Sequence, residues 1–331
     1  MRIKEVGLGI IGLGYVGQIH LKNSQKIAGA YVAGVADLSK KHLNFARQSG
    51  VKKTYSDYAD LLKDPDIDSV IISLPNYLHL ECAQTAAEYR KNILLEKPIA
   101  RNLDEAKQVI SAVRKNSVKL MMGYPLRFNS IFRELKAQIK ERSLGDVEVA
   151  HAVNIGSGPF FAREEMHAPA PVPDWWFNKE LTGGGVLIDL GCHMINLLRW
   201  YFGDIIDIKS CLRRRFKMDF EDSATCIATF KSGTLGVINV GWFSQENKVS
   251  VELFGSVKHA TSYAPPPHPL LTAAQTLITG TPKNFKPFLL ELQHFVNYTV
   301  SDIRPVSSAE DGLKDIEAIS LAYENQLDIE A

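Results

Sequence analysis

The sequence is poor in cysteine, in net charge and in long hydrophobic runs, and each shortage removes a class of protein. Its four cysteines are far apart with no C-x-x-C pair, which argues against a zinc ribbon or redox dithiol and suits a reducing compartment. The 38 basic and 37 acidic residues leave a net charge of +1, so neither nucleic acid nor an anionic membrane is an expected partner. No apolar run is expected to span a bilayer, and a glycine turn interrupts the run near residue 10 that could pass for a signal peptide. We therefore expect a cytoplasmic protein.

Hydrolase motifs are also missing, since the chain has no G-x-S-x-G elbow and no Ser-His-Asp order. What is present is a length of 331 residues, of which 45% are hydrophobic. That combination predicts a globular protein of about two domains with a sizeable core.

Three glycines at residues 12–17 form a dinucleotide-binding pattern. Gly12, Gly14 and Gly17 follow a short apolar strand and open a helix with the spacing G-x-G-x-x-G. The first permits a tight turn, the second lets the backbone approach a pyrophosphate, and the third allows helix and strand to pack closely. A rival register that starts five residues earlier leaves a charged preceding strand, and we reject it.

Asp37 ends a second apolar run, over residues 31–36, at the position where the dinucleotide pattern places an acid for the adenosine ribose. The 2′-phosphate of NADP would meet like charge beside this carboxylate, so we predict NAD over NADP. Ser39, Lys40 and Lys41 follow closely and can shelter a phosphate, which keeps NADP as an alternative.

Residues 1–124 alternate apolar strands with helical patterns and predict a Rossmann domain built on a doubly wound parallel sheet. Ligands of such sheets sit at the carboxyl ends of the strands. The segments that follow strands directly are therefore assigned to the site. They are Pro75-Asn76-Tyr77-Leu78-His79 with Leu74 before it, Glu96-Lys97-Pro98, and Gly123-Tyr124.

Residues 125–331 are predicted to form an α+β domain for substrate binding and oligomerisation. Helices are expected at 128–142, 186–201, 288–298 and 312–324, and strands at 147–155, 205–216, 224–230, 234–243 and 249–254. Short turns between successive strands imply a large, mostly antiparallel open sheet. The strands of residues 224–254 are apolar on both alternations, so a lone domain would expose a large apolar face. We expect a homodimer or homotetramer through that face.

A triple glycine at residues 183–185 precedes a predicted helix on which Asp189 and His193 lie one turn apart. A carboxylate beside an imidazole can fix its tautomer. The ordinary alternative is a helix-terminal acid and a satisfied core histidine, but a buried pair without function is costly in desolvation. Zinc would need three or four ligands and only these two cluster, so we predict no metal site.

Together these motifs resemble the Gfo/Idh/MocA oxidoreductases, the group of glucose–fructose oxidoreductase, inositol dehydrogenase and a rhizopine-catabolism protein. The resemblance covers nearly the whole chain. The motifs that carry it are the glycine turn with Asp37, Pro75-Asn76 with His79, Glu96-Lys97-Pro98, Gly123-Tyr124 with Arg127-Phe128-Asn129, and Gly183-Gly184-Gly185 leading to Asp189-Leu190-Gly191-Cys192-His193.

The resemblance implies roles for individual residues. Lys97, Asp189 and His193 would be catalytic, while Asn76, His79 and Glu96 would lie near the nicotinamide ribose. The family often has a cis peptide at the position of Lys97-Pro98. The full predicted cofactor set is Gly12, Gly14, Tyr15, Val16, Gly17, Asp37, Leu74, Pro75, Asn76, His79, Glu96 and Lys97. The predicted substrate set is Tyr124, Arg127, Trp176, Asp189 and His193, with His167 and Trp175 as further candidates; for the two tryptophans, packing of their loop is an equal alternative.

The expected activity is hydride transfer between nicotinamide and a secondary alcohol or ketone of a sugar, cyclitol or nucleotide sugar. A reductase of a keto sugar, enone or dihydrodiol-type substrate is the alternative enzyme, and a non-catalytic NAD-binding sensor is the alternative class. The intact catalytic set argues against the sensor. The sequence departs from the family at Asn196, where an acid is frequent, at Trp176-Phe177 in place of Trp-Arg, and at Ser130 in place of proline.

Overall fold

The computed structural model describes residues 5–159, 173–262, 286–301 and 303–327, which form two compact units. The first unit takes its residues from 1–100, 104–128 and 267–310, and the second from 101–103, 129–266 and 311–331. The main passage between them, at residues 128–129, lies close to the predicted boundary at 124. The division is not contiguous, however, because helix α10 (Lys286–Val300) belongs to the first unit.

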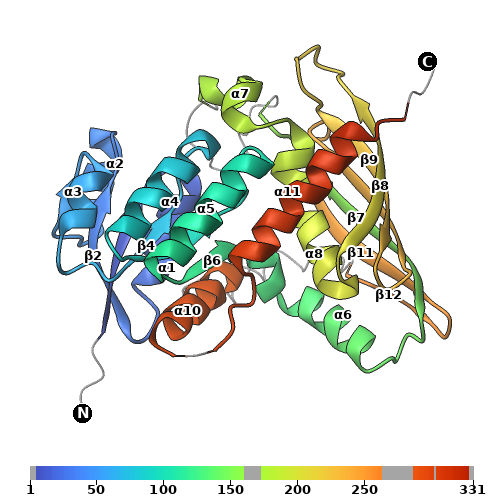
Figure 1. The fold of residues 1–331 in the computed structure, drawn as a ribbon, viewed down its shortest axis with the longest axis horizontal. Helices are drawn as coiled ribbons and strands as arrows, with labels where there is room; N and C mark the ends of the chain where they lie inside the picture. Colours follow the sequence, from blue (N-terminus) through green and yellow to red (C-terminus); the bar gives the residue numbers. More distant parts are fainter. Residues whose placement is uncertain (1–4, 160–172, 263–285, 302, 328–331) are drawn as a thin grey trace. The chain divides into compact units, whose positions relative to one another are not determined.

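The first unit is built on a parallel sheet of six strands, of which β2, β4 and β6 are labelled in Figure 1. The strand order is β3-β2-β1-β4-β5-β6. All neighbouring strands pair in parallel, as predicted. The strand order reverses between β1 and β4, and ligands of doubly wound sheets bind at that point. The strands are β1 (Val6–Ile11), β2 (Ala30–Ala36), β3 (Thr54–Tyr55), β4 (Ser69–Ile72), β5 (Asn92–Glu96) and β6 (Leu120–Gly123).

Helices connect these strands as the alternating sequence pattern predicts. They are α1 (Tyr15–Ser24), α2 (Lys40–Gln48), α3 (Tyr58–Lys63), α4 (His79–Glu88) and α5 (Leu103–Asn116), with 3₁₀ turns η1 (Asn76–Leu78) and η2 (Pro125–Phe128). Ser39 caps α2, as expected, by accepting a hydrogen bond from the amide of His42. A cap of this kind stabilises a helix by about 1 kcal/mol.

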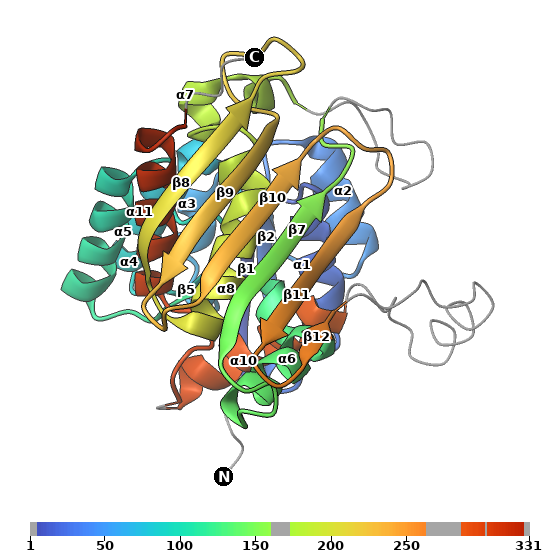
Figure 2. The same ribbon diagram turned by 90° about the vertical axis from the view of Figure 1, so that its right-hand side faces the viewer.

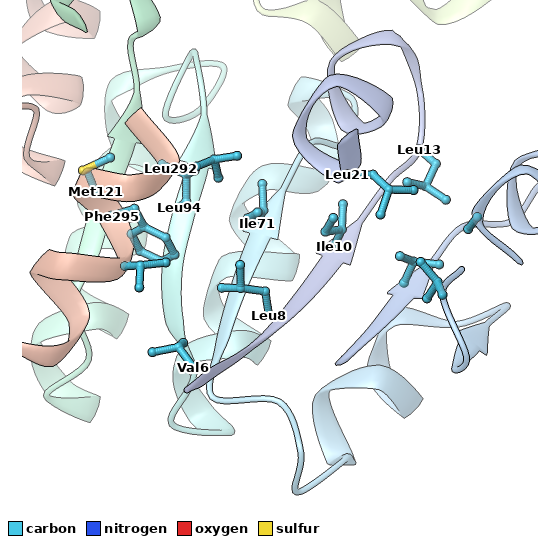
Figure 3. Packing of buried hydrophobic residues seen from close by; sticks show 14 of the residues in the cluster. Val6, Leu8, Ile10, Leu13, Leu21, Ile71, Leu94, Met121, Leu292 and Phe295 are labelled. Carbon is cyan, nitrogen blue, oxygen red and sulfur yellow. The ribbon is translucent and has the colours of Figure 1, made fainter. Parts of the chain in front are cut away.

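The core of the first unit lies between the sheet and the helices that cover it (Figure 3). Side chains from five strands meet there, among them Leu8, Ile71, Leu94 and Met121. Helix α10 adds Leu292 and Phe295, both fully buried. Burial of one such side chain contributes about 1.5–3 kcal/mol, which explains why α10 packs on this sheet.

The second unit contains a mixed sheet in the order β12-β11-β7-β10-β9-β8. Its strands are β7 (Val147–Ile155), β8 (Ile205–Arg213), β9 (Ser223–Phe230), β10 (Leu235–Gly241), β11 (Lys248–Gly255) and β12 (His259–Thr261). The predicted antiparallel character is confirmed for every pair except β7–β10. Since β10 and β11 run in opposite directions and β7 lies between them, β7 is parallel to one of the two, β10.

One broad face of this sheet has no described helix of the second unit over it (Figure 2). Helices α8 (Cys192–Phe202) and α11 (Ala309–Glu324) lie on the opposite face. The open face carries Ile227 and Leu235, which are 53% and 45% exposed, and Phe254, which is 44% exposed. A polar row crosses it, since Asn239 bonds His151 on one side and Thr225 on the other, each at 2.8 Å.

The unit also contains α6 (Ser130–Lys140), α7 (Lys179–Thr182) and the 3₁₀ turn η3 (Asp174–Phe177).

The stretch Lys179–Phe202 meets the length and hydropathy of a membrane span, which the sequence analysis did not expect of any segment. Within its most apolar window, 72% is buried inside the protein. The stretch is also divided between α7 and α8. These are properties of a core helix.

Candidate active site

The glycine turn after β1 has the shape that a dinucleotide requires. Gly12 has a φ of +87°, and a Cβ there would stand 2.5 Å from the carbonyl oxygen of Ser73. A Cβ on Gly17 would stand 2.0 Å from the carbonyl oxygen of Gly12. Beside Gly14, in contrast, a Cβ would meet no atom within 4 Å. The turn is therefore closed on the protein side and open at Gly14, where a pyrophosphate would approach. Both extra glycines of the rival register lie inside β1.

Helix α1 begins at Tyr15, directly after this turn. Its first-turn amides have no partner within the helix, and the helix dipole adds about half a positive charge at that end. Tyr15 is exposed, Val16 is half-buried and the first turn contains no acid. The end of the helix therefore fits a bound phosphate.

Asp37 is held in place beside the turn by three hydrogen bonds. Its Oδ2 accepts from the amide of Leu13 at 2.6 Å, and its Oδ1 accepts from the amide of Ser39 at 2.7 Å. The ring Nδ1 of His42 lies 3.1 Å from Oδ2. The carboxylate is thus fixed at the end of β2, the place predicted for contact with the ribose.

His79 lies behind the segment that follows β4. Leu74, Pro75 and Asn76 are half-buried, whereas His79 is buried. Its Nδ1 lies 2.7 Å from the carbonyl oxygen of Pro98, and its Nε2 lies 2.9 Å from that of Leu74. Burial lowers the pKa of this imidazole. His79 therefore joins the segments that follow β4 and β5. We expect it to influence the ribose through the positions of these two segments.

Lys97 is half-buried within residues 93–100, whose other members are all buried. The peptide bond between Lys97 and Pro98 is cis. Glu96, just before it, turns inward, where its Oε1 lies 2.7 Å from Nε2 of His20. Its place near the ribose stays a prediction, and Glu96 lies at the strand end that precedes Lys97.

Tyr124 and Arg127, two residues of the predicted substrate set, are buried in the first unit. They are 1% and 2% exposed. The guanidinium of Arg127 donates to the carbonyl oxygen of Val306 at 2.7 Å, which holds the chain after α10 against the first unit. Arg127 therefore has a structural contact, and the contact of Tyr124 and Arg127 with substrate stays a prediction.

In the second unit, the predicted helix after the triple glycine begins with a π-helical turn, Leu187–Gly191, and continues as α8. Glu221 fixes this beginning. Its carboxylate accepts from the amide of Leu187 at 2.9 Å and from the hydroxyl of Tyr323 at 2.8 Å. A Cβ on Gly185 would stand 1.9 Å from the carbonyl oxygen of Glu221, so this approach requires glycine. Burial raises the pKa of Glu221.

The π-turn displaces carbonyl groups from the regular helical ladder, and side chains pair with them. Asn154 of β7 donates to the carbonyl oxygen of Leu190 at 3.3 Å, and the thiol of Cys192 donates to that of Asp189 at 3.2 Å. Asp189 and His193 are half-buried on a helix whose neighbouring positions are mostly buried. The pair predicted from spacing is thus accessible on one side of an otherwise buried helix.

Other residues singled out in the second unit take part in packing. Asn196 is buried and donates to Asp315 at 2.7 Å, which accounts for an amide where the family often has an acid. Trp176 packs between Trp175 and Trp242, at ring-centroid distances of 5.6 and 6.1 Å. His167 lies outside the described residues.

The predicted site residues thus fall into two sets. In the first unit, the glycine turn, Asp37, the Leu74–His79 segment and Lys97 gather at the carboxyl ends of β1, β2, β4 and β5. In the second unit, Asp189 and His193 share one helix. Three residues that hold these sets in place could not be predicted, because no local pattern distinguishes them from other polar residues. They are His20, Asn154 and Glu221.

The two units match two domains of known proteins. Residues 6–124 match the Gfo/Idh/MocA oxidoreductase family, NAD-binding Rossmann fold, and residues 132–260 match its C-terminal domain. A myo-inositol 2-dehydrogenase of Thermotoga maritima is 28% identical, over 75% of this chain and 72% of that protein. A trans-1,2-dihydrobenzene-1,2-diol dehydrogenase of Xenopus laevis is 32% identical, over 52% of this chain and 48% of its own. The crystal structure of a probable dehydrogenase from Thermotoga maritima superposes with a TM-score of 0.83 at 25% identity, covering 97% of this chain and 96% of the other. The chain therefore belongs to the Gfo/Idh/MocA family of NAD-binding oxidoreductases.

Proposed function

We propose that this oxidoreductase transfers a hydride between NAD and a secondary alcohol or ketone of a sugar, cyclitol or nucleotide sugar. The likeness to a myo-inositol 2-dehydrogenase over three quarters of the chain supports a polyhydroxylated ring as substrate. A ring of this kind presents several hydroxyl groups to polar side chains at a time.

One observation carries the proposal. Lys97, Asp189 and His193 are the half-buried polar residues of segments that are otherwise mostly buried. A charged or titratable side chain in such a place loses solvation, and groups of this kind mark a candidate functional site. Glu221 and Asn154 hold the π-turn that carries Asp189, and His79 holds the chain on either side of Lys97.

The first unit has the shape that NAD requires. The open side of Gly14 and the first amides of α1 would hold the pyrophosphate, and Asp37 would accept hydrogen bonds from the adenosine ribose. Leu74, Pro75 and Asn76 would line the nicotinamide end. When bound, the nicotinamide supplies the acceptor or donor of the hydride.

The protein's own groups would manage the proton. We assign His193 as the base that removes the hydroxyl proton during oxidation, since an imidazole changes charge near neutral pH. Asp189, four residues earlier on the same helix, would fix its tautomer. Lys97 would hold the substrate oxygen and stabilise the charge that develops on it.

A substrate panel tests this function. Purified protein with NAD should reduce the cofactor in the presence of some member of a set of inositols, aldoses and UDP-sugars, followed by the absorbance of NADH. Lys97→Ala run in parallel should abolish the signal. If no member of the panel supports turnover in either direction, the proposal is wrong and the sensor alternative gains.

The dihydrodiol dehydrogenase likeness supports a second candidate substrate class. It covers about half of either chain, so we rank a dihydrodiol or its ketone below a sugar or cyclitol. Adding a trans-dihydrodiol to the panel separates the two, because the substrate with the higher kcat/KM identifies the class.

We further propose a homodimer or homotetramer in which the open face of the β7–β12 sheet is covered by another copy. Its exposed Ile227, Leu235 and Phe254 support this, since monomers rarely leave so broad an apolar face in water. Free thiols at all four cysteines agree with a cytoplasmic location.

A further inference from the structure

Three titratable side chains meet in the interior of the first unit, outside the catalytic set. His20 comes from α1, Glu96 from the end of β5, and Glu291 from α10. One ligand-type atom of each lies within 4.8 Å of the others. His20 and Glu291 are fully buried, and Glu96 is 7% exposed.

The two carboxyl groups differ in their surroundings. Glu96 has a direct 2.7 Å contact between its Oε1 and Nε2 of His20. Neither oxygen of Glu291 has a hydrogen-bond partner of normal geometry. Burial, and then the negative charge of Glu96, raise the pKa of Glu291 well above its usual range, and the backbone of Tyr124 offsets only part of that shift.

Two carboxylates this close in an apolar interior repel each other and cannot both stay ionised without a compensating charge. Two titratable groups on neighbouring elements bond to the backbone of Val306. Arg127 of η2 donates to the carbonyl oxygen of Val306, and His294 of α10 accepts from the amide of Val306. His79 and Lys97 are further groups near Glu96, on the side of the candidate active site.

We propose that Glu291 is a proton-binding site. It holds a proton at neutral pH and shares that proton with Glu96 through a hydrogen bond. The protonated carboxyl of Glu291 donates to the carboxylate of Glu96, and His20 fixes that carboxylate from the other side. Glu96 is the last residue of β5 and precedes Lys97, so the shared proton makes Glu291 a positioning residue for the strand end that carries Lys97.

A divalent cation is the rival occupant of the same cluster, and the geometry disfavours it. Ligand atoms around a tetrahedral zinc lie about 2.0–2.2 Å from the metal, which places neighbouring ligand atoms roughly 3.3 Å apart. The observed 2.7 Å between His20 and Glu96 is the distance of a direct hydrogen bond.

Glu291→Gln tests the proposal, because glutamine is neutral and keeps a donor toward Glu96. An acid that is protonated in the folded state and ionised in the unfolded state loses stability as pH rises above its ordinary pKa of about 4.3. Glutamine does not titrate. From about pH 5 upward, the unfolding constant of the wild type should therefore rise relative to that of Glu291→Gln, by up to tenfold per pH unit. Denaturant titrations at several pH values measure the ratio.

Two further variants complete the design. Glu291→Met has a similar volume but no donor. Its stability should depend on pH in the same way as that of Glu291→Gln, and it should be less stable than Glu291→Gln at every pH. Glu88→Gln removes an exposed acid and is the control. The wild type itself should show the infrared C=O band of a protonated carboxylic acid at pH 7, and that band should persist in Glu221→Gln.

Parallel pH–stability curves for wild type and Glu291→Gln would overturn the proposal. So would the absence of the infrared band, a measurement that does not require either variant to fold. Chelator treatment could also lower the Tm of the wild type but not of Glu291→Gln, with recovery on adding Zn²⁺ or Mn²⁺. That result would overturn the proposal and show that the cluster binds a metal ion instead of a proton.

Discussion

The carboxylate of Asp37 accepts a 2.6 Å hydrogen bond from the backbone amide of Leu13, so the end of β2 is tied to the glycine turn. The amide of Gly12 adds a second tie, since it donates to the carbonyl oxygen of Ala36 at 2.9 Å. The residue expected to choose the cofactor thus also shapes the turn that holds it. Substitutions at Asp37 therefore test both functions together.

Asp37→Asn removes the charge and keeps an oxygen that can accept a hydrogen bond. We expect tighter NADPH binding by tenfold or more, because repulsion from a like charge at about 4 Å is worth roughly 1–4 kcal/mol. NADH binding should weaken by a smaller factor. Fluorescence titrations with both reduced cofactors measure the change, and Asp60→Asn, an exposed acid of α3, is the control. A wild type that prefers NADPH would contradict the assignment.

Gly14→Ala and Gly17→Ala form a matched pair. A methyl group at Gly14 meets no protein atom within 4 Å, so the fold should keep its Tm while NADH binding weakens at least tenfold. At Gly17 the methyl group would press on the carbonyl oxygen of Gly12, so we expect a loss of about 1–3 kcal/mol in the free energy of unfolding. Thermal melts with and without NADH distinguish the two effects. Equal losses of stability in both variants would disprove this account of the turn.

Lys97→Ala and His193→Ala should each lower kcat by about 10²–10⁴-fold, the usual cost of removing a general acid or base. The dissociation constant of NADH should change little, which separates catalysis from binding. Lys97→Arg keeps the charge and should retain more activity than alanine. Near-normal turnover of both alanine variants on the identified substrate would remove them from the mechanism.

Ile227→Glu should dissociate the proposed oligomer, because it places a charge on the open face of the sheet. Light scattering at micromolar concentration should show a dimer or tetramer for the wild type and a smaller species for the variant. Tyr89→Glu, at an exposed position of the first unit, should leave the mass unchanged. A monomeric wild type would refute the assembly.

Much of the fold follows from short-range patterns in the sequence. The turn at Gly12 and the cap at Ser39 each depend on residues close together in the chain, and the strands β1, β2 and β4 read as continuous apolar runs. The positions of Lys97 and Asp37 follow from them, because a residue after a parallel strand lies at the ligand edge of the sheet.

Features that depend on contacts between residues far apart in the chain could not be predicted from the sequence. The parallel pairing of β7 with β10 joins residues more than 80 positions apart, as in Leu235 with Val149. The π-turn depends on Glu221 and Tyr323, neither of which lies in its own helix. The hydrogen bond from Arg127 to the carbonyl oxygen of Val306, 179 residues later, leaves no local trace in the sequence.

The return of α10 to the first sheet has a consequence for synthesis on the ribosome. Leu292 and Phe295 fill the core beneath β1, β4 and β5, yet they are translated long after residue 128. At 5–20 residues per second, the nascent Rossmann sheet waits on the order of 10–35 s with part of its apolar surface uncovered. A chain truncated at residue 128 should therefore be aggregation-prone, and this domain, although it is the first to emerge, cannot be completed until α10 has been translated.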